Sequence, residues 1–190
     1  MTTAFDVRLS DAVDAAERVF AQYGYGQATM RDVADAAHLS IAGLYYYLPS
    51  KEQALYLVCE RAFRRLSRAL DEAAQLPGGH EDRLHAFVRG HVDFLAGKPH
   101  AYRVLLRDLE ALTGDGRTHI FELRRAYFAR AADLVIAVQQ ERQSPVSTHL
   151  ATAALFGMMN WMPMWHRDGT QGAAQIAAQM SRLFLHGVAA

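Results

Sequence analysis

The sequence has little cysteine, no long apolar run and no excess of charge of either sign. Its single cysteine, Cys59, excludes an internal disulfide bond and fits a reducing compartment. No apolar run reaches the roughly 18 residues of a membrane-spanning helix, and the first residues lack the apolar segment of a secretory signal. We therefore expect a cytoplasmic protein without a membrane partner. The 20 basic and 20 acidic side chains balance, so global charge gives no sign of a nucleic-acid partner.

Catalytic and metal-binding patterns are also missing from the sequence. It contains no glycine-rich phosphate loop, no nucleophile elbow and no close carboxylate pair, so we expect no enzyme activity. The nine histidines include no HxxxH or HExxH pair, and Asp82 with His85 makes only half of a helical di-iron motif. We accordingly expect neither a cofactor nor a metal site.

The sequence does have helical periodicity from end to end. Apolar residues recur at three- and four-residue intervals, and glycine or proline separates the periodic segments. No segment has the alternation of a strand, so we predict an all-α fold of about nine helices. The predicted helices cover residues 6–23, 29–37, 41–47, 50–75, 81–96, 100–112, 117–143, 145–166 and 171–188. We expect a turn at 113–116 and a helix start at Ser144-Pro145.

Two short helices joined by a tight turn stand out near the N-terminus. Thr29 and Ser40 are typical helix N-caps, and His38-Leu39 lies between the two helices. The second helix places Leu44 and Leu48 on one side and small residues with tyrosines on the other. Such a helix suits insertion into a DNA major groove, because small residues let the backbone approach base edges and tyrosine hydroxyls reach phosphates. By itself, the same pattern also fits plain packing within a helical protein.

Residues 9–55 resemble the N-terminal domain of the tetracycline-repressor (TetR) family of bacterial transcription regulators. The resemblance is carried by Ala15-Ala16, Val19-Phe20, Tyr23-Gly24-Tyr25, Thr29, Arg31-Asp32-Val33-Ala34, Leu39-Ser40, Gly43-Leu44-Tyr45-Tyr46, Pro49-Ser50-Lys51-Glu52 and Leu55. It implies a three-helix helix-turn-helix DNA-binding domain at residues 1–50. It also implies a larger helical domain at 51–190 for ligand binding and dimerisation.

The resemblance assigns candidate DNA contacts. Phosphate-contacting positions match Thr29, Ser40, Tyr45, Tyr46, Tyr47 and Lys51, and base-facing positions match Ile41, Ala42 and Gly43. We add Arg31 from its charge and position. Residues 1–68 carry eight basic and eight acidic side chains, which departs from the basic surface of most DNA-binding domains. We interpret the arginines at 61, 64, 65 and 68 as a solvated face that pairs with Glu60, Asp71 and Glu72.

The helix predicted at 145–166 is apolar nearly all round, and a chain this small cannot surround it alone. A second copy is the simplest cover, with the small-residue helix at 171–188 in the same interface. We therefore predict a homodimer, as the resemblance also implies. The predicted interface residues are Ala154, Leu155, Met159, Ile176, Met180, Leu183 and Phe184.

Methionines and aromatic residues gather in the helices between 81 and 166. Core packing explains most of them, but methionines also line adaptable cavities, and the resemblance implies a small-molecule pocket here. Its predicted lining is Phe87, His91, Phe94, Tyr102, Leu106, Tyr127, Phe128, Met158, Trp161, Met162 and Trp165. Residues 155–169 resemble more closely a subset that senses fatty acyl or acyl-CoA compounds. Met164 stands where that subset often has a basic residue, which leaves Arg124, Arg125 and Arg167 as alternative phosphate contacts or ordinary surface residues.

The function implied is a dimeric regulator, usually a repressor, that binds a palindromic operator in double-stranded DNA and is released by a small hydrophobic effector. Two alternatives stay open at this point. One is a DNA-binding regulator that needs no ligand because its core is filled. The other is a helical binding or enzyme domain whose N-terminal helices merely pack.

Overall fold

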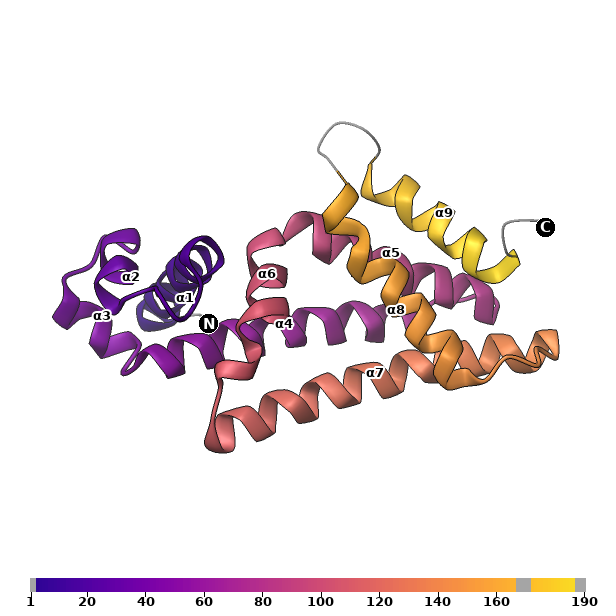
Figure 1. Ribbon diagram of the computed structural model, residues 1–190, viewed down its shortest axis with the longest axis horizontal. Coiled ribbons are helices and arrows are strands. Elements are labelled where there is room, and N and C mark those ends of the chain that lie inside the picture. The colour runs from indigo at the N-terminus through magenta and orange to yellow at the C-terminus, as the bar shows by residue number, and fades with distance from the viewer. Residues whose placement is uncertain (1–2, 167–171, 187–190) are drawn as a thin grey trace. The chain divides into compact units, whose positions relative to one another are not determined.

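The chain folds into helices, as predicted. The computed structural model describes residues 3–166 and 172–186, and over these ranges it contains nine α-helices, one short 3₁₀ helix and no strand (Figure 1). They are α1 (Ala4–Tyr23), α2 (Met30–Ala36), α3 (Ile41–Tyr47), α4 (Lys51–Ala74), α5 (His80–Gly97), α6 (Pro99–Arg107), η1 (Leu109–Ala111), α7 (Gly114–Arg142), α8 (Thr148–Trp165) and α9 (Ala173–His186).

The predicted turn at 113–116 is wrong, because α7 already begins at Gly114. The reason is a contact across 61 residues of sequence. The carboxylate of Glu52 accepts hydrogen bonds from the backbone N–H of Thr113 at 2.9 Å and from its hydroxyl at 2.6 Å. These bonds hold the residue that precedes α7, so the helix can start within a glycine-rich stretch. They also lower the pKa of the Glu52 carboxyl, the side-chain bond more than the backbone one.

The predicted helix start at Ser144-Pro145 is also wrong. Helix α8 begins at Thr148, and the hydroxyl of Ser147 caps it by accepting a hydrogen bond from the N–H of Leu150. The preceding segment is held as a turn because the side-chain amide of Gln139 donates to the carbonyl of Val146 at 2.7 Å.

The chain divides into two compact units, one made of residues 1–63 and 100–123, the other of 64–99 and 124–190. Helices α4 and α7 each contribute residues to both units. The first unit therefore contains more than the DNA-binding domain that we predict at residues 1–50. It adds the start of α4, all but the first residue of α6, η1 and the start of α7.

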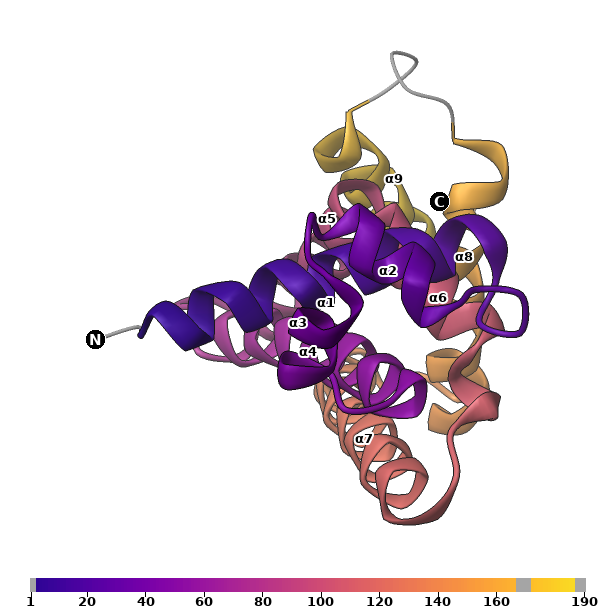
Figure 2. The same cartoon turned by 90° about the vertical axis from the view of Figure 1, so that its left-hand side faces the viewer.

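In the first unit, α1, α2 and α3 pack against one another (Figure 2). Arginines of α6 join this group at the C-terminal end of α1, where helix carbonyls lack intrahelical partners. Arg103 donates to the carbonyl of Ala21, and Arg107 donates to that of Phe20. Gly24 ends α1 with φ of +83°, and a Cβ added there would lie 3.4 Å from the Arg107 guanidinium. The positive φ favours glycine at this position, and the arginine leaves an added Cβ only ordinary van der Waals contact.

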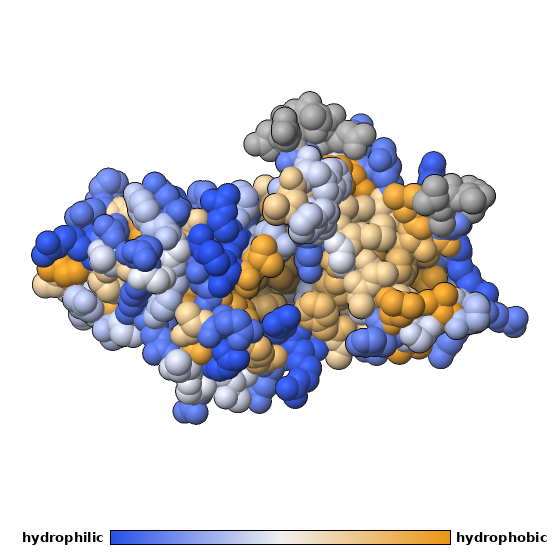
Figure 3. Space-filling view, in the orientation of Figure 1, coloured by the Kyte–Doolittle hydropathy of each residue, from blue (hydrophilic) through white to orange (hydrophobic). Residues whose placement is uncertain are grey.

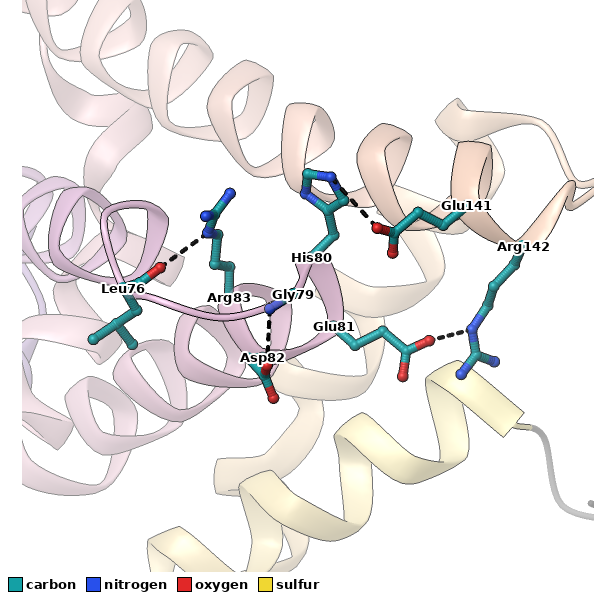
Figure 4. Close-up of polar contacts among 8 residues, drawn as sticks. All are labelled: Leu76, Gly79, His80, Glu81, Asp82, Arg83, Glu141 and Arg142. Carbon is teal, nitrogen blue, oxygen red and sulfur yellow. Dashed lines mark hydrogen bonds and ion pairs between the residues drawn. The ribbon is translucent and has the colours of Figure 1, made fainter.

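In the second unit, α5 packs against α8 and α9. Figure 4 shows the polar contacts around its N-terminal end: Glu81 pairs with Arg142 of α7, His80 faces Glu141, and Asp82 accepts from the N–H of Gly79 at 2.9 Å. Arg142 also donates to the carbonyl of Leu185 in α9. A single arginine at the end of α7 therefore contacts both α5 and α9.

Candidate DNA-binding surface and effector centre

The two short helices of the first unit are capped as predicted. Thr29 and Asp32 form a capping box: the Thr29 hydroxyl accepts from the Asp32 N–H at 3.2 Å, and the Asp32 carboxylate accepts from the Thr29 N–H at 2.8 Å. The Thr29 side chain and backbone bonds lower the pKa of Asp32. Ser40 caps α3 by accepting from the N–H of Gly43 at 3.0 Å. Because α3 has only seven residues, this cap is a large part of what holds its first turn.

The turn between α2 and α3 and the inner side of α3 fix where that helix lies. His38 has φ of +55°, and the N–H of Leu39 returns to the carbonyl of Ala34 at 2.9 Å. Leu44 and Leu48 are fully buried. The opposite side of α3 is therefore the one that faces solvent.

Seven of the ten predicted DNA contacts are exposed: Thr29, Arg31, Ser40, Ile41, Ala42, Tyr45 and Tyr46. Gly43, Tyr47 and Lys51 are partly buried. Tyr46 is the most open of the large residues here, with 70% of its surface exposed. Because the buried leucines hold this short helix in place, the exposed Tyr46 side chain is available to contact another molecule.

Lys51 has a position that the sequence does not reveal. Its ammonium lies 4.5 Å from the centroid of the Tyr25 ring and donates to the carbonyl of Gly26 at 3.4 Å. Lys51 is the first residue of α4, and these contacts join it to the segment between α1 and α2. Partial burial raises the pKa of the Tyr25 phenol, and the nearby charge of Glu52 adds to this.

The arginine that opens the basic stretch of α4 pairs differently from our prediction. Arg61 contacts Asp14 at 2.7 Å and the buried Glu17 at 2.9 Å, both in α1. Asp71, which we expected to pair within α4, contacts Arg130 of α7. The local sequence suggested neighbours on the same helix, whereas the tertiary structure supplies partners from other helices.

The centre of the second unit is a buried polar group surrounded by aromatic rings. His91 of α5 lies 2.7 Å from the hydroxyl of Tyr127 through Nδ1 and 3.0 Å from Oδ1 of Asn160 through Nε2. A neutral imidazole that donates from Nε2 to the amide oxygen and accepts a hydrogen bond from the Tyr127 hydroxyl at Nδ1 satisfies both contacts. Phe87 and Phe156 complete the surroundings, with ring centroids 6.2 and 5.6 Å from that of His91.

Burial decides the protonation of this group. Desolvation lowers the pKa of His91 from 6.5 to about 4, although the bond to Asn160 acts in the opposite direction. Desolvation also raises the pKa of Tyr127. Both side chains are thus neutral near pH 7, and the centre is a set of hydrogen-bonding groups without charge.

The predicted pocket residues do not all meet at this centre. Phe87, His91 and Tyr127 do, and Phe128 stacks on Phe156 with ring centroids 4.0 Å apart. Phe94 and Met162 are buried. Leu106 is 68% exposed and belongs with Tyr102 to the first unit.

Two residues of this centre are missing from our predicted lining. Phe156 and Asn160 both lie in the segment 155–169 that resembles the acyl-sensing subset. Asn160 is the only amide side chain in the apolar helix α8, and this is the sequence feature that could have pointed to a polar contact there. Of the alternative phosphate contacts, Arg125 is exposed, the Arg124 guanidinium lies 5.8 Å from the Phe128 ring, and Arg167 lies outside the described residues.

The predicted pocket residues Met158, Trp161 and Trp165 line a groove of about 380 Å³ between α8 and α9 instead. Trp161 is 64% and Trp165 50% exposed. Figure 3 shows hydrophobic residues gathered over these two helices. The reason is the spacing along α8, which turns these side chains away from α5.

The predicted interface residues are divided between this surface and the core below it. Leu155, Met159, Ile176 and Met180 are buried within the single chain, so they pack under the surface and offer a partner little area of their own. The remaining three are Ala154 and Leu183, which are exposed, and Phe184, which is partly exposed.

The described parts of the chain give no support for a metal site, a reactive thiol or a membrane-spanning helix. Residues 3–166 and 172–186 contain no group of three or more histidine, cysteine or acidic side chains that could hold a metal ion. His85 contacts the hydroxyl of Ser181 at 3.1 Å. Burial raises the pKa of the Cys59 thiol to about 12. Within the same residues, no helix has the length and apolar content to cross a membrane.

Comparison with protein families gives two matches in different parts of the chain. Residues 12–55 match the family described as bacterial regulatory proteins, tetR family, and residues 77–188 match the tetracyclin repressor-like C-terminal domain. Among curated proteins, the transcriptional activator FasR of Mycolicibacterium smegmatis is 29% identical over 54% of this chain and 47% of its own length. The repressor KstR of the same species is 29% identical over 63% and 60%. The alignments thus span about half to three fifths of these relatives.

Solved structures match over nearly the whole chain. The regulator PfmR of Thermus thermophilus has a TM-score of 0.84 and 26% identity, covering 93% of this chain and 98% of its own. A regulator from Bordetella parapertussis has a TM-score of 0.87 and 25% identity, covering 96% of both. AibR, solved with isovaleryl coenzyme A and operator DNA, has a TM-score of 0.84 and 23% identity over 94% and 98%, which shows a shared fold.

Proposed function

Because the chain belongs to the tetracycline-repressor family of bacterial regulatory proteins, we propose that it binds operator DNA as a dimer and regulates transcription. The observation that carries this proposal is α3: a seven-residue helix, capped by Ser40, anchored by two buried leucines and exposing Tyr45 and Tyr46. In a dimer, two such helices enter successive major grooves, roughly 34–36 Å apart along one side of the duplex.

The DNA-reading surface works with few charges. Arg31 and Lys51 are the cations among the ten proposed contacts, and both lie near helix N-termini whose amides also attract phosphate. Ile41 adds apolar contact to thymine methyl groups. Two cations from each protomer of a dimer neutralise about four phosphates, so few counterions are released and the slope of log affinity against log salt is shallow, at about −4.

The test is a binding titration with a labelled duplex selected from a random-sequence pool by the wild-type protein. Tyr46→Ala is expected to weaken binding at least about fivefold, equal to about 1 kcal/mol, while the dimer persists in sedimentation. Gln22→Ala, at an exposed position of α1, is the matched control. Unchanged affinity for Tyr46→Ala would remove α3 from the DNA-reading surface.

We further propose that the polar centre of the second unit senses a small hydrophobic effector, a fatty acyl or acyl-CoA compound. The uncharged donors and acceptors of His91, Tyr127 and Asn160 among aromatic rings suit a carbonyl or thioester with an apolar chain. The resemblance of residues 155–169 to acyl-sensing regulators supports this class, and AibR is an example of the fold with such a thioester. The effector acts only as far as it binds the released conformation better than the DNA-bound one.

One observation favours a ligand-independent regulator as the second candidate. Both ring nitrogens of His91 already have partners, and Phe128 is stacked on Phe156. An effector must therefore displace protein contacts. Thermal unfolding with acyl-CoA thioesters of increasing chain length separates the two: a rise in Tm that Tyr127→Phe abolishes supports sensing, and a constant Tm with every thioester supports the filled core.

FasR is an activator and KstR a repressor, so transcription from the bound promoter, measured with and without the thioester, assigns the direction of control.

A further inference from the structure

The first turn of α1 brings an aromatic ring to the outer side of α3. The Phe5 ring lies 5.2 Å from that of Tyr47 and 5.7 Å from that of Tyr46, measured between centroids. Tyr46 and Tyr47 are themselves 5.0 Å apart and nearly perpendicular, at 84°. Three rings from two distant parts of the sequence therefore contact one another, in the edge-to-face and tilted geometries that aromatic pairs favour.

This cluster lies on the surface. Phe5 is 42% exposed and Tyr46 is 70% exposed. A phenylalanine that only filled the core would be covered, as the fully buried Phe20 of the same helix is. The Phe5 side chain instead rests on the two tyrosines that the proposed DNA-reading surface uses.

The turn that carries Phe5 is fixed by its own capping box. The Thr3 N–H donates to the Asp6 carboxylate at 2.8 Å, and the Asp6 N–H donates to the Thr3 hydroxyl at 3.1 Å. The Thr3 N–H and the Thr3 hydroxyl, the latter at 2.8 Å, both donate to the Asp6 carboxylate and lower its pKa, so the carboxyl is ionised near pH 7. The capping box therefore fixes the position from which Phe5 reaches the tyrosine rings of α3.

We propose that Phe5 is a positioning residue for DNA recognition: it holds the Tyr46 and Tyr47 rings in the orientation that reads the operator. This inference rests on the proposed function, since it assumes that the two tyrosines contact DNA. A ring that is already held loses less side-chain freedom on binding, so affinity depends on a residue outside the helix-turn-helix segment. Phe5 therefore belongs to the recognition surface, whereas Val7 of the same turn does not.

The test uses the full-length protein and the same selected duplex at one salt concentration. Phe5→Ala is expected to weaken binding about three- to tenfold, and Phe5→Tyr is expected to restore most of it. Val7→Ala is the matched control, because Val7 lies two residues after Phe5 in α1 and is 51% exposed. In the Tyr46→Ala background, Phe5→Ala is expected to cost less than it does in the wild type, since one of its two contacts is gone.

Three results would overturn the inference in different ways. If Tyr46→Ala and Tyr47→Ala leave affinity unchanged, the proposed reading surface fails, and the role of Phe5 fails with it. If the tyrosine variants weaken binding and Phe5→Ala does not, only the positioning role fails. If Phe5→Ala costs the same factor with and without Tyr46 and lowers Tm in proportion, Phe5 merely stabilises α1.

Discussion

Acid is expected to destabilise this protein through His91 in particular. The folded state holds the imidazole neutral down to about pH 4, whereas the unfolded chain takes up a proton near 6.5. Between these values the unfolded state binds more protons, so stability is complete above pH 6.5 and falls as pH decreases toward 4. The separation of the two pKa values corresponds to about 3 kcal/mol lost over that interval.

The assay is urea unfolding followed by circular dichroism at several pH values between 7 and 4, at one protomer concentration because dimerisation contributes to stability. His91→Gln removes the titrating group and keeps a polar side chain. The wild type is expected to lose about 3 kcal/mol more than this variant between pH 7 and pH 4. Tyr127, which faces His91, stays neutral throughout because burial raises its pKa. Carboxylates such as Glu81 titrate equally in both proteins and cancel in the difference.

Parallel plots of unfolding free energy against pH for the wild type and His91→Gln would refute the reasoning. They would mean that the imidazole has the same pKa in the folded and the unfolded state. His149, which is exposed at the start of α8, provides the control, and His149→Gln is expected to leave the wild-type pH dependence intact.

Three further outcomes follow from contacts in the first unit. The Cys59 thiol, whose pKa burial raises to about 12, is expected to react with a thiol reagent at pH 8 only after unfolding, as a mass measurement over time would record. Arg107→Ala removes the donor to the Phe20 carbonyl and leaves the buried Asp108 without this cation, so we expect a loss of about 3 kcal/mol in urea unfolding; a change below about 0.5 kcal/mol would contradict it. Thr29→Ala removes the cap of α2, and its expected cost of about 1 kcal/mol should disappear in part with Thr29→Ser, measured as a shift in Tm.

Local signals were sufficient for the N-terminal helices. Thr29 and Ser40 were recognisable as caps because their hydroxyls act on amides three residues away. Leu44 and Leu48, four residues apart, predicted the buried side of α3 and hence the exposed one. Capping and periodicity are short-range effects, so the sequence contains all the information that they require.

Contacts between distant residues were not predictable in this way. Glu52 starts α7 by bonding to Thr113, and Arg61 selects acidic partners in α1 over those on its own helix. The composition of α8 likewise left open which apolar side chains turn toward α5 and which, such as Trp161, lie in the groove beside α9.

The sequence by itself determined the helical class, the caps and anchors of the two short helices and the resemblance to a regulator family. Only the tertiary structure decided that His91 meets Tyr127 and Asn160, and that Phe5 reaches the tyrosines of α3. The physical reason is range. Helix formation is governed by neighbours within one or two turns, whereas a buried hydrogen-bonded centre and a shared aromatic surface exist only where helix packing brings separate segments together.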